Sequence, residues 1–312
     1  MRKLTLPSVD NFIPGKMDEM GIGYDTLSKL NPKLIHASIS GYGASGPYAK
    51  RAGYDIIAGA EAGLLHITGE ANGPPTKAGV AVTDLSTGLF MHGAIMSALH
   101  ARNRTGKGQK IDGSLFETQL ALLINVAACW LNLGLEGKRW GTEHPSIVPY
   151  GSFPTKDSYL IMGATNNRQF VTLLKLLKRP GLSEDPRFDT NDARVINRVE
   201  LNSLLQDIFK TKTTDEWLAA FDGSGLPYGP INNVERAFSH AQAQARQMVQ
   251  TIDFDAATNG KFEVPGFPVK FSDTGPSVRS SPPLLGQHTE EVLREIGLSR
   301  VEIARLREMS II

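Results

Sequence analysis

The chain has very little cysteine, which excludes several kinds of site. Cys129 is the single cysteine among 312 residues, so neither an intrachain disulfide nor a thiolate metal site can form. One thiol fits a reducing compartment, and its place in the apolar run 122–130 predicts a buried structural side chain. The sequence also has no HExxH or other Cys/His ligand set, so no metal is expected.

An excess of charge of one sign is also missing. The chain has 33 basic and 32 acidic residues, for a net charge of +1, and 7% of its residues are aromatic. Surfaces that bind nucleic acid or anionic membranes need basic patches, and those that stack on bases need aromatic side chains. We therefore expect neither nucleic acid nor a membrane among the partners.

Long hydrophobic runs and targeting segments are not visible. The most apolar stretch, 119–135, is interrupted by Gln119, Asn125 and Asn132, so it predicts a buried core helix rather than a membrane span. The opening residues, MRKLTLPSVDNF, lack the apolar region of a secretory signal and are too poor in arginine and serine for a mitochondrial presequence. With 41% hydrophobic residues, the chain can bury one large core or two moderate ones.

Strand and helix patterns alternate along the first 135 residues. Apolar β-branched runs predict strands at 34–40, 79–82 and 109–115. Helical spacing predicts helices over 16–30, 54–65 and 85–99. This order predicts an α/β fold in which parallel strands are joined by right-handed crossovers.

The composition changes at about residue 136 and indicates the domain organisation. We predict a large domain over 1–135, a linker over 136–154, a small α+β domain over 155–238 and a C-terminal segment over 239–312 that returns to the large domain. Within the small domain, Thr213 and Glu216 predict the capped start of a helix over 214–221. Short strands are expected at 262–264 and 269–271.

Asp84 lies at the turn between the predicted strand 79–82 and the predicted helix after it, and two explanations fit it. Its carboxylate can cap the helix by accepting a hydrogen bond from a free N–H group of the first turn, which is worth roughly 0.5–2 kcal/mol. An ionised carboxylate at the end of an α/β sheet can instead act as a covalent nucleophile, with nearby N–H groups stabilising an oxyanion.

Motifs along nearly the whole chain resemble those of the family III CoA-transferases, the CaiB/BaiF type that includes formyl-CoA and carnitinyl-CoA transferases. The run 138–153, KRWGTEHPSIVPYGSF, is most similar to the succinyl-CoA:glutarate branch. The other matching stretches, in family order, are SISGYGASGP (38–47), RAGYDIIAGAEAGL (51–64), GVAVTDLSTGL (79–89), RTGKGQKID (104–112), GATNNRQF (163–170), GLPYGPINN (225–233) and PPLLGQHTEEVLREIGLS (282–299).

The resemblance implies a Rossmann-like large domain and an interlocked homodimer. It makes Asp84 the catalytic aspartate of a CoA-transferase that needs no cofactor beyond coenzyme A as substrate. Two segments match CoA-contacting segments of the family, and their residues are Asn11, Phe12, Ile13, Arg51, Ala52, Gly53 and Tyr54.

The resemblance also implies the chemistry and the partners, which are an acyl-CoA and a small carboxylic acid. The aspartate attacks the thioester, a mixed anhydride and an aspartyl-CoA thioester follow, and the acceptor acid collects CoA. We expect succinyl-CoA as donor and glutarate or a similar dicarboxylate as acceptor. Arg139, His144 and Arg168 are candidates for binding the distal carboxylate, although solvated surface roles also fit them.

Two features depart from the family pattern. The family's glycine-rich flap would lie near 141–144, which is not glycine-rich here. Family members also carry an opening βαβ portion ahead of the position of Asn11, so we expect the chain to be N-terminally shortened. The resemblance implies the mitochondrial matrix as compartment, with the cytoplasm as the alternative.

Two other functions compete with CoA transfer. An α-methylacyl-CoA racemase on the same fold would add a histidine near Gly53 or Tyr54, but the sequence has none over 51–60. His66 comes nearest, and a packed or surface histidine explains it as well. A shortened, inactive chain that only binds a partner is the other alternative, and the intact turn at Asp84 counts against it.

Overall fold

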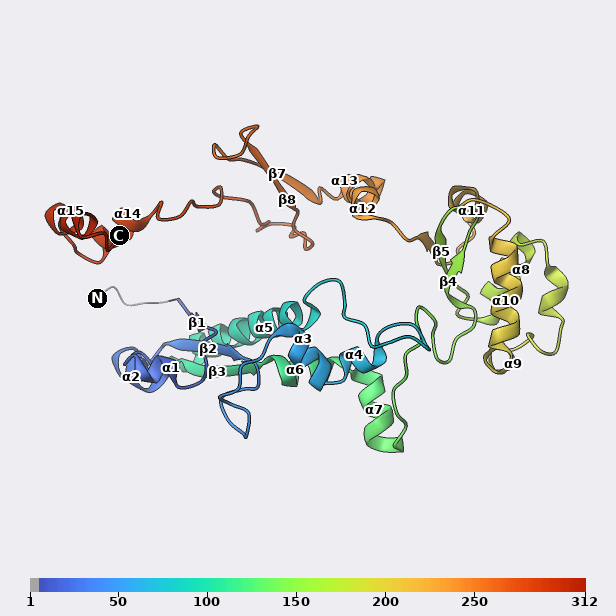
Figure 1. Ribbon diagram of the computed structural model, residues 1–312, viewed down its shortest axis with the longest axis horizontal. Coiled ribbons are helices and arrows are strands. Elements are labelled where there is room, and N and C mark those ends of the chain that lie inside the picture. Colours follow the sequence, from blue (N-terminus) through green and yellow to red (C-terminus); the bar gives the residue numbers. More distant parts are fainter. Residues whose placement is uncertain (1–5) are drawn as a thin grey trace. The chain divides into compact units, whose positions relative to one another are not determined.

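The computed structural model describes residues 6–312, and the chain divides into two compact units, 1–229 and 230–312. The first part of unit 1 runs from β1 to α7 (Figure 1). Its elements are β1 (Ser8–Asp10), α1 (Lys16–Glu19), α2 (Tyr24–Leu30), β2 (Ile35–Ser40), α3 (Asp55–Glu61), α4 (Leu64–Ile67), α5 (Val82–Thr105), β3 (Gln109–Ser114), α6 (Leu115–Leu122) and α7 (Ile124–Leu133).

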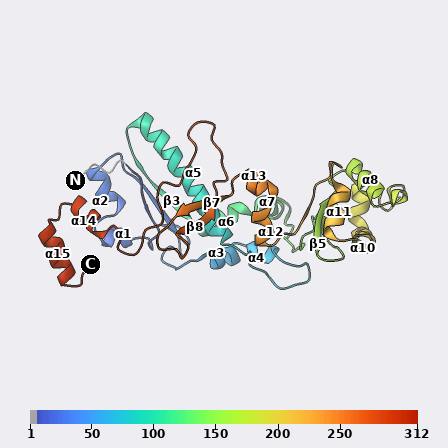
Figure 2. The ribbon, with the colours of Figure 1, turned by 90° about the horizontal axis from the view of Figure 1, so that it is seen from above.

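The first three strands form a parallel sheet in the order β1-β2-β3, as the α/β prediction requires. Ser38 of β2 is in register with Asp10 of β1 and with Asp112 of β3. Helix α5 lies along this sheet and contacts β2 and β3 (Figures 1 and 2). The contact is close, since a Cβ atom on Gly113 of β3 would come within 2.4 Å of the Met91 sulfur of α5.

The predictions for this part hold for most elements but are wrong at 79–82. Those residues contain no strand, because two bends lead directly into α5 at Val82. The predicted helix over 54–65 is divided into α3 and α4 by Gly63, whose φ of 88° belongs to the left-handed region. The predicted segment over 16–30 is likewise two helices, α1 and α2.

The apolar stretch 119–135 is not the buried helix that its composition predicts. It forms the end of α6 and all of α7, with a bend of 79° between the two helices. No residue of α7 is buried, and Leu131 is 78% exposed. Cys129 is exposed as well, so the buried thiol was a wrong prediction. Within residues 6–312 no single helix has the length and apolar character of a membrane span, although α6 and α7 reach them jointly.

The second part of unit 1 builds its own hydrophobic core, whose buried members lie between Val148 and Leu226. Phe209 is at the centre of an aromatic cluster with Phe153, Trp217 and Phe221. The elements are β4 (Tyr150–Pro154), β5 (Tyr159–Gly163), α8 (Asn167–Leu176), the 3-10 helix η1 (Pro180–Ser183), α9 (Asn191–Ile196), α10 (Arg198–Phe209), α11 (Thr214–Phe221) and β6 (Tyr228–Pro230, which extends one residue into unit 2).

Helix α11 follows its sequence signal, whereas β4 lies within the stretch 136–154 that was predicted as a linker. Strands β4 and β5 are antiparallel, and the sheet order is β4-β5-β6. Helix α11 begins with the predicted capping box, in which the Thr213 side chain accepts from the Glu216 N–H and the Glu216 side chain accepts from the Thr213 N–H.

Unit 2 contains a two-stranded antiparallel sheet and four short helices. Its buried hydrophobic core is small, with Ile303 of α15 as the buried member. Strand β8 covers the predicted strand at 262–264 and pairs with β7, whereas 269–271 is not a strand. The elements are α12 (Val234–Ser239), α13 (Ala241–Ala245), β7 (Val249–Asp253), β8 (Lys261–Pro265), α14 (Thr289–Glu295) and α15 (Arg300–Glu308).

A fully buried arginine, Arg194 of α9, connects the loop before β4 to the core of the second part. Its guanidinium donates to the carbonyl oxygens of Val148 and Phe188 at 2.7 and 2.9 Å and to Asn167 Oδ1 at 2.9 Å. It also lies 4.3 Å from the centre of the Phe170 ring. Burial lowers the pKa of this guanidinium, but an arginine remains charged at neutral pH.

We predict that Arg194→Met destabilises the second part of unit 1 by about 2–5 kcal/mol, because three buried acceptors lose their donor. Urea unfolding followed by tryptophan fluorescence measures the loss. Arg187→Met is the matched control, since Arg187 is exposed and pairs at the surface with Asp185 and Glu200. Equal midpoints for the two variants would contradict the prediction.

Candidate functional site

The start of α5 lies at the carboxyl end of the parallel sheet. Helix α5 leads through the short turn 106–108 into β3, so helix and strand run in opposite directions. Met91 of α5 lies beside Gly113 near the end of β3, so the first turn of α5 extends past the carboxyl end of that strand. Helices α3 and α6 contact α5, and Figure 1 shows both beside this end of it. Ligands of open α/β sheets bind outside the carboxyl ends of the strands.

The cap of α5 comes from another helix. Ala81, the N-cap residue, offers no side-chain hydrogen bond to the helix. Asp55, the first residue of α3, supplies it: its Oδ1 accepts from the backbone N–H groups of Thr83 at 2.9 Å and Asp84 at 3.1 Å. The capping explanation of Asp84 is therefore wrong, because Asp55 occupies that role.

Buried threonines fix the position of this turn. Thr83 is 1% exposed and donates its hydroxyl to Gln119 Oε1 of α6 at 2.8 Å. One turn later, the buried Thr87 donates to the carbonyl oxygen of Thr83 at 2.8 Å. The N-terminus of α5 is thus held by a carboxylate from α3 and an amide from α6.

Asp84 itself is exposed, and its carboxylate has no hydrogen-bond partner within residues 6–312. Partial desolvation raises the pKa of the Asp84 carboxyl above its ordinary value, and the negative charge of Asp55 raises it further. A carboxylate that is exposed, unbonded and more basic than usual is suited to attack an electrophile.

The predicted CoA segment 11–13 follows β1, and two of its residues, but not Asn11, border a cavity of about 320 Å³ beside the sheet. Phe12 and Ile13 line it on one side, and Lys50 and Lys110 add two cations. Its other lining residues are Asp10, Pro14, Gly15, Met17, Asp18, Gly23, Tyr24, His36, Ser38, Ser40, Ala44, Ala49 and Asp112.

A buried polar cluster forms the floor of this cavity. Asp10 Oδ2 accepts from Ser38 Oγ at 2.7 Å and lies 3.0 Å from His36 Nε2. His36 is 2% exposed. An ionised aspartate only accepts hydrogen bonds, so His36 carries its proton on Nε2.

The second predicted CoA segment, 51–54, packs against the glycine loop 41–46. The Arg51 guanidinium lies 5.4 Å from the ring centres of both Tyr42 and Tyr48 and pairs with Glu61 at 2.8 Å. Two residues after Arg51, a Cβ atom on Gly53 would come within 2.7 Å of the Gly41 Cα atom. The two backbones approach so closely that neither position has room for a side chain.

The three candidates for binding a distal carboxylate lie in separate places. Arg139 donates to the carbonyl oxygen of His66 at 2.9 Å, and its Nε is buried without a partner in residues 6–312. His144 Nδ1 accepts from the Ser146 N–H at 3.2 Å. Arg168 is exposed in the first turn of α8. Within residues 6–312, no hydrogen bond or ion pair links any of them to Asp84.

The stretch 141–144, where the flap of the family would lie, is held locally. Glu143 accepts from Asn202 at 3.1 Å and pairs with Arg198 at 3.5 Å. Thr142 Oγ1 accepts from the Ser152 N–H at 2.8 Å. A flap role for this stretch gains no support from these contacts.

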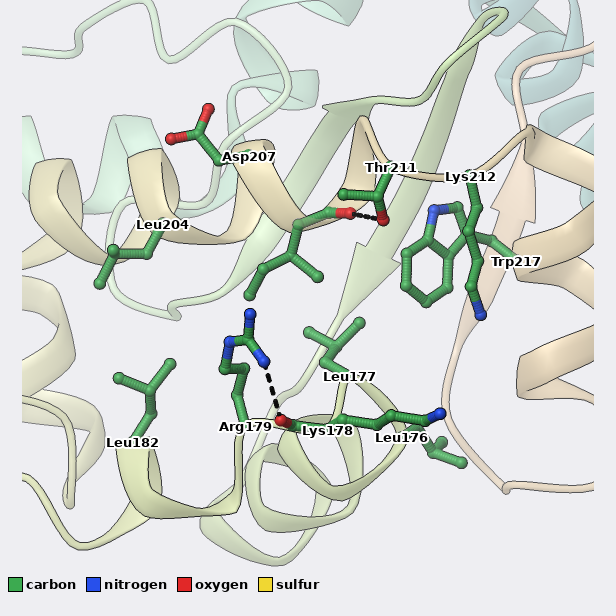
Figure 3. A pocket seen from close by; sticks show the side chains of 11 residues that line it. Leu176, Leu177, Lys178, Arg179, Leu182, Leu204, Asp207, Thr211, Lys212 and Trp217 are labelled. Atoms are coloured by element: carbon green, nitrogen blue, oxygen red, sulfur yellow. Dashed lines mark hydrogen bonds between the residues drawn. The ribbon is translucent and has the colours of Figure 1, made fainter.

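A further cleft, of about 470 Å³, lies between α8, α10 and α11 (Figure 3). Figure 3 shows the Arg179 guanidinium pointing into it, and this group donates to the carbonyl oxygen of Lys178 at 3.1 Å. The Lys212 ammonium lies 4.6 Å from the centre of the Trp217 ring. Two basic side chains of this cleft, those of Arg179 and Lys212, therefore already have contacts within the fold. Among residues 6–312, no group of three or more His, Cys, Asp or Glu side chains could hold a metal ion.

The model of one protein family, described as CoA-transferase family III, matches residues 8–289. The chain belongs to this family. An acyl-CoA transferase of Fusarium pseudograminearum is 57% identical over 304 residues, which are 97% of this chain and 67% of that protein. The succinyl-CoA:glutarate CoA-transferase of Mus musculus is 50% identical over 92% of this chain and 66% of that protein. The chain thus spans about two thirds of the length of these relatives.

A solved structure of the same family agrees with this fold. The crystal structure of a CAIB/BAIF family protein from Brucella suis is 40% identical, with a TM-score of 0.81 over 93% of this chain and 75% of that chain. The predicted α/β fold class and the family resemblance are both confirmed. The roles of the individual site residues stay predictions.

Sequence reasoning missed Asp55, although it directly follows the predicted segment 51–54. Its signal was an aspartate at the start of a helix, which usually indicates only a local cap. It also missed Lys110 and the pair of Asp10 with His36, because neighbouring strands bring them together. Lys50 was missed as well, and it reaches the same cavity from the loop after β2.

We predict that Gly53→Ala in this family III chain destabilises the fold by about 1–3 kcal/mol, because the new methyl group forces the loops around Gly41 and Gly53 apart. Gly79→Ala is the matched control, since a Cβ atom there meets nothing within 4 Å. Thermal unfolding of both variants tests this, and a Gly53→Ala variant as stable as the control would refute it.

Proposed function

We propose that this chain belongs to an enzyme that moves CoA from an acyl-CoA, with succinyl-CoA as donor, to glutarate or a similar dicarboxylate. The observation that carries the proposal is the Asp84 carboxylate, which is exposed, has a raised pKa and lies at the carboxyl end of the sheet. The substrate class rests on the relatives named succinyl-CoA:glutarate CoA-transferase in Mus musculus and Homo sapiens.

The reaction we propose needs no proton transfer. An Asp84 oxygen attacks the thioester carbonyl carbon, the carbon–sulfur bond breaks, and CoA leaves as a thiolate. The thiolate then attacks the aspartyl carbonyl of the mixed anhydride, which releases the donor acid and leaves an aspartyl-CoA thioester. The acceptor carboxylate repeats both steps in reverse order, so that it leaves as the new acyl-CoA and Asp84 is restored.

The cavity beside β1 is the proposed site for the nucleotide end of CoA. Lys50 and Lys110 supply positive charge for phosphate groups, and Phe12 and Ile13 supply an apolar wall. Arg51, Ala52, Gly53 and Tyr54 follow Lys50 in the chain but do not line this cavity, so their proposed contact with CoA rests on the family resemblance.

Arg139 is the best supported of the candidates for the distal carboxylate. Its Nε is buried and unpartnered, so a bound carboxylate would satisfy a donor that the described residues leave unpaired. The Arg168 guanidinium and the His144 ring stay weaker candidates, because the former is exposed and the latter accepts a local hydrogen bond.

A homodimer and the mitochondrial matrix complete the proposal. The exposed apolar side chains of α7, among them Trp130 at 55% and Leu131 at 78%, support an interface with a second subunit. The compartment rests on the resemblance alone.

We predict that Asp84→Asn and Asp84→Ala abolish CoA transfer and leave the unfolding temperature within a few degrees of the parent, since the side chain is exposed. Hydroxylamine treatment of the parent after incubation with acyl-CoA should modify Asp84, as peptide mass spectrometry would show. Modification at another residue, or substantial activity of Asp84→Asn, would refute the proposed nucleophile.

We predict a preference for C4–C6 dicarboxylates over formate, oxalate and carnitine-type acids in a panel of acceptors. Arg139→Met should raise KM for glutarate roughly 10- to 100-fold, because a charge-assisted hydrogen bond to the distal carboxylate is lost. Its effect on a monocarboxylate acceptor should be much smaller, and Arg187→Met should change neither value. A preference for the other acids would overturn the substrate class.

A further inference from the structure

The carboxylates of Asp55 and Asp84 both lie at the first turn of α5. Only the Asp55 carboxylate accepts hydrogen bonds from the N–H groups of that turn. Asp55 Oδ1 accepts both free N–H groups, those of Thr83 and Asp84, at 2.9 and 3.1 Å. A helix N-terminus stabilises a nearby anion, and it does so mainly through such N–H groups. Because Asp55 takes both donors, the Asp84 carboxylate does not receive them.

We propose that Asp55 is a positioning residue that keeps Asp84 nucleophilic, both by occupying the N–H groups of the α5 start and by placing a like charge beside Asp84. The inference rests on the proposed function, in which Asp84 attacks a thioester. That attack moves one negative charge from Asp84 to the CoA sulfur, as the carbon–oxygen bond forms and the carbon–sulfur bond breaks. Repulsion by Asp55 therefore disfavours the state before the attack and is relieved in the covalent enzyme.

The charge of Asp55 has no competitor on the elements that contact α5. Glu61 pairs with Arg51, Glu117 accepts from the Ser114 hydroxyl, and His36 pairs with Asp10. Asp112 accepts from the Ala44 N–H, and Lys110 lines the cavity. Within residues 6–312, Asp55 is the charged group that raises the pKa of the Asp84 carboxyl.

Asp55→Asn separates the charge from the cap. The amide oxygen of asparagine can still accept both N–H groups, but its side chain is neutral. Asp192→Asn is the matched control, because Asp192, like Asp55, is an aspartate in the first turn of a helix, α9. Asp192 is exposed, whereas Asp55 is half-buried. Asp55→Ala removes the cap as well and shows the cost of losing it.

The first measurement is the titration of Asp84 by carbon NMR of the chain labelled at the aspartate carboxyl carbons, with Asp84→Asn to assign the signal. Removal of a like charge favours the ionised form, so the midpoint of Asp84 should fall in Asp55→Asn, by about half to one pH unit. The unfolding temperature of Asp55→Asn should stay close to that of the parent, whereas that of Asp55→Ala should fall by a few degrees. The control should change neither value.

The second measurement is the amount of covalent enzyme trapped on Asp84 after mixing with succinyl-CoA at pH 7. It should fall about three- to tenfold in Asp55→Asn, which is the factor that corresponds to the expected midpoint change. The role of Asp55 would be overturned if the Asp84 midpoint were the same in the parent and in Asp55→Asn. It would also be overturned if Asp192→Asn changed that midpoint as much as Asp55→Asn does. If the Asp84 midpoint falls in Asp55→Asn as expected but the parent chain traps no acyl group, the proposed function is overturned and the role of Asp55 is not.

Discussion

The start of α5 depends on a carboxylate that belongs to another helix. Ala81 cannot cap α5, and the first N–H groups of a helix need partners. Asp55 supplies one oxygen for two of them, and this contact joins α3 to α5. The bond between Thr83 and Gln119 joins α6 at the same turn. Three helices are thus fixed at the point where the parallel sheet ends, and this arrangement fixes the position of Asp84.

Signals that act within a few residues allowed most of the fold to be predicted. The strands β2 and β3, their parallel pairing and the capping box at Thr213 follow from periodicity and side-chain chemistry over short distances. The strand expected at 79–82 was wrong: Gly79 and Val80 form bends, Ala81 is the N-cap of α5, and only Val82 belongs to the helix. The sequence allowed Asp84 as a cap of its own helix, but the carboxylate that caps the helix lies 29 residues earlier in the chain. Patterns within a few residues do not predict a hydrogen bond between residues so far apart in the chain.

Burial was harder to predict than secondary structure. The stretch 119–135 was expected to be buried because it is apolar, yet α7 has no buried residue and Cys129 is exposed. Apolar composition indicates which side chains are stabilised by burial away from water. It does not indicate whether they are buried by the same chain or by another one. The buried arginine shows the opposite case. Arginine is usually a surface residue, so the sequence alone does not predict that Arg194 is buried. Its burial is explained by the hydrogen-bond acceptors of Val148, Phe188 and Asn167, which the fold brings around it.

A helix start is a difficult place for a nucleophilic carboxylate. The N–H groups and the dipole that hold the carboxylate ionised also lower its basicity, and a less basic oxygen attacks a thioester more slowly. In the role that we propose for Asp55, the second carboxylate resolves this conflict, because Asp55 binds the N–H groups and adds a repulsive charge. Asp84 then keeps the exposed position of a helix start without the hydrogen bonds that would stabilise its anion. In the mechanism that we propose, the same repulsion favours every state in which Asp84 carries an acyl group or CoA, since those states are neutral at Asp84.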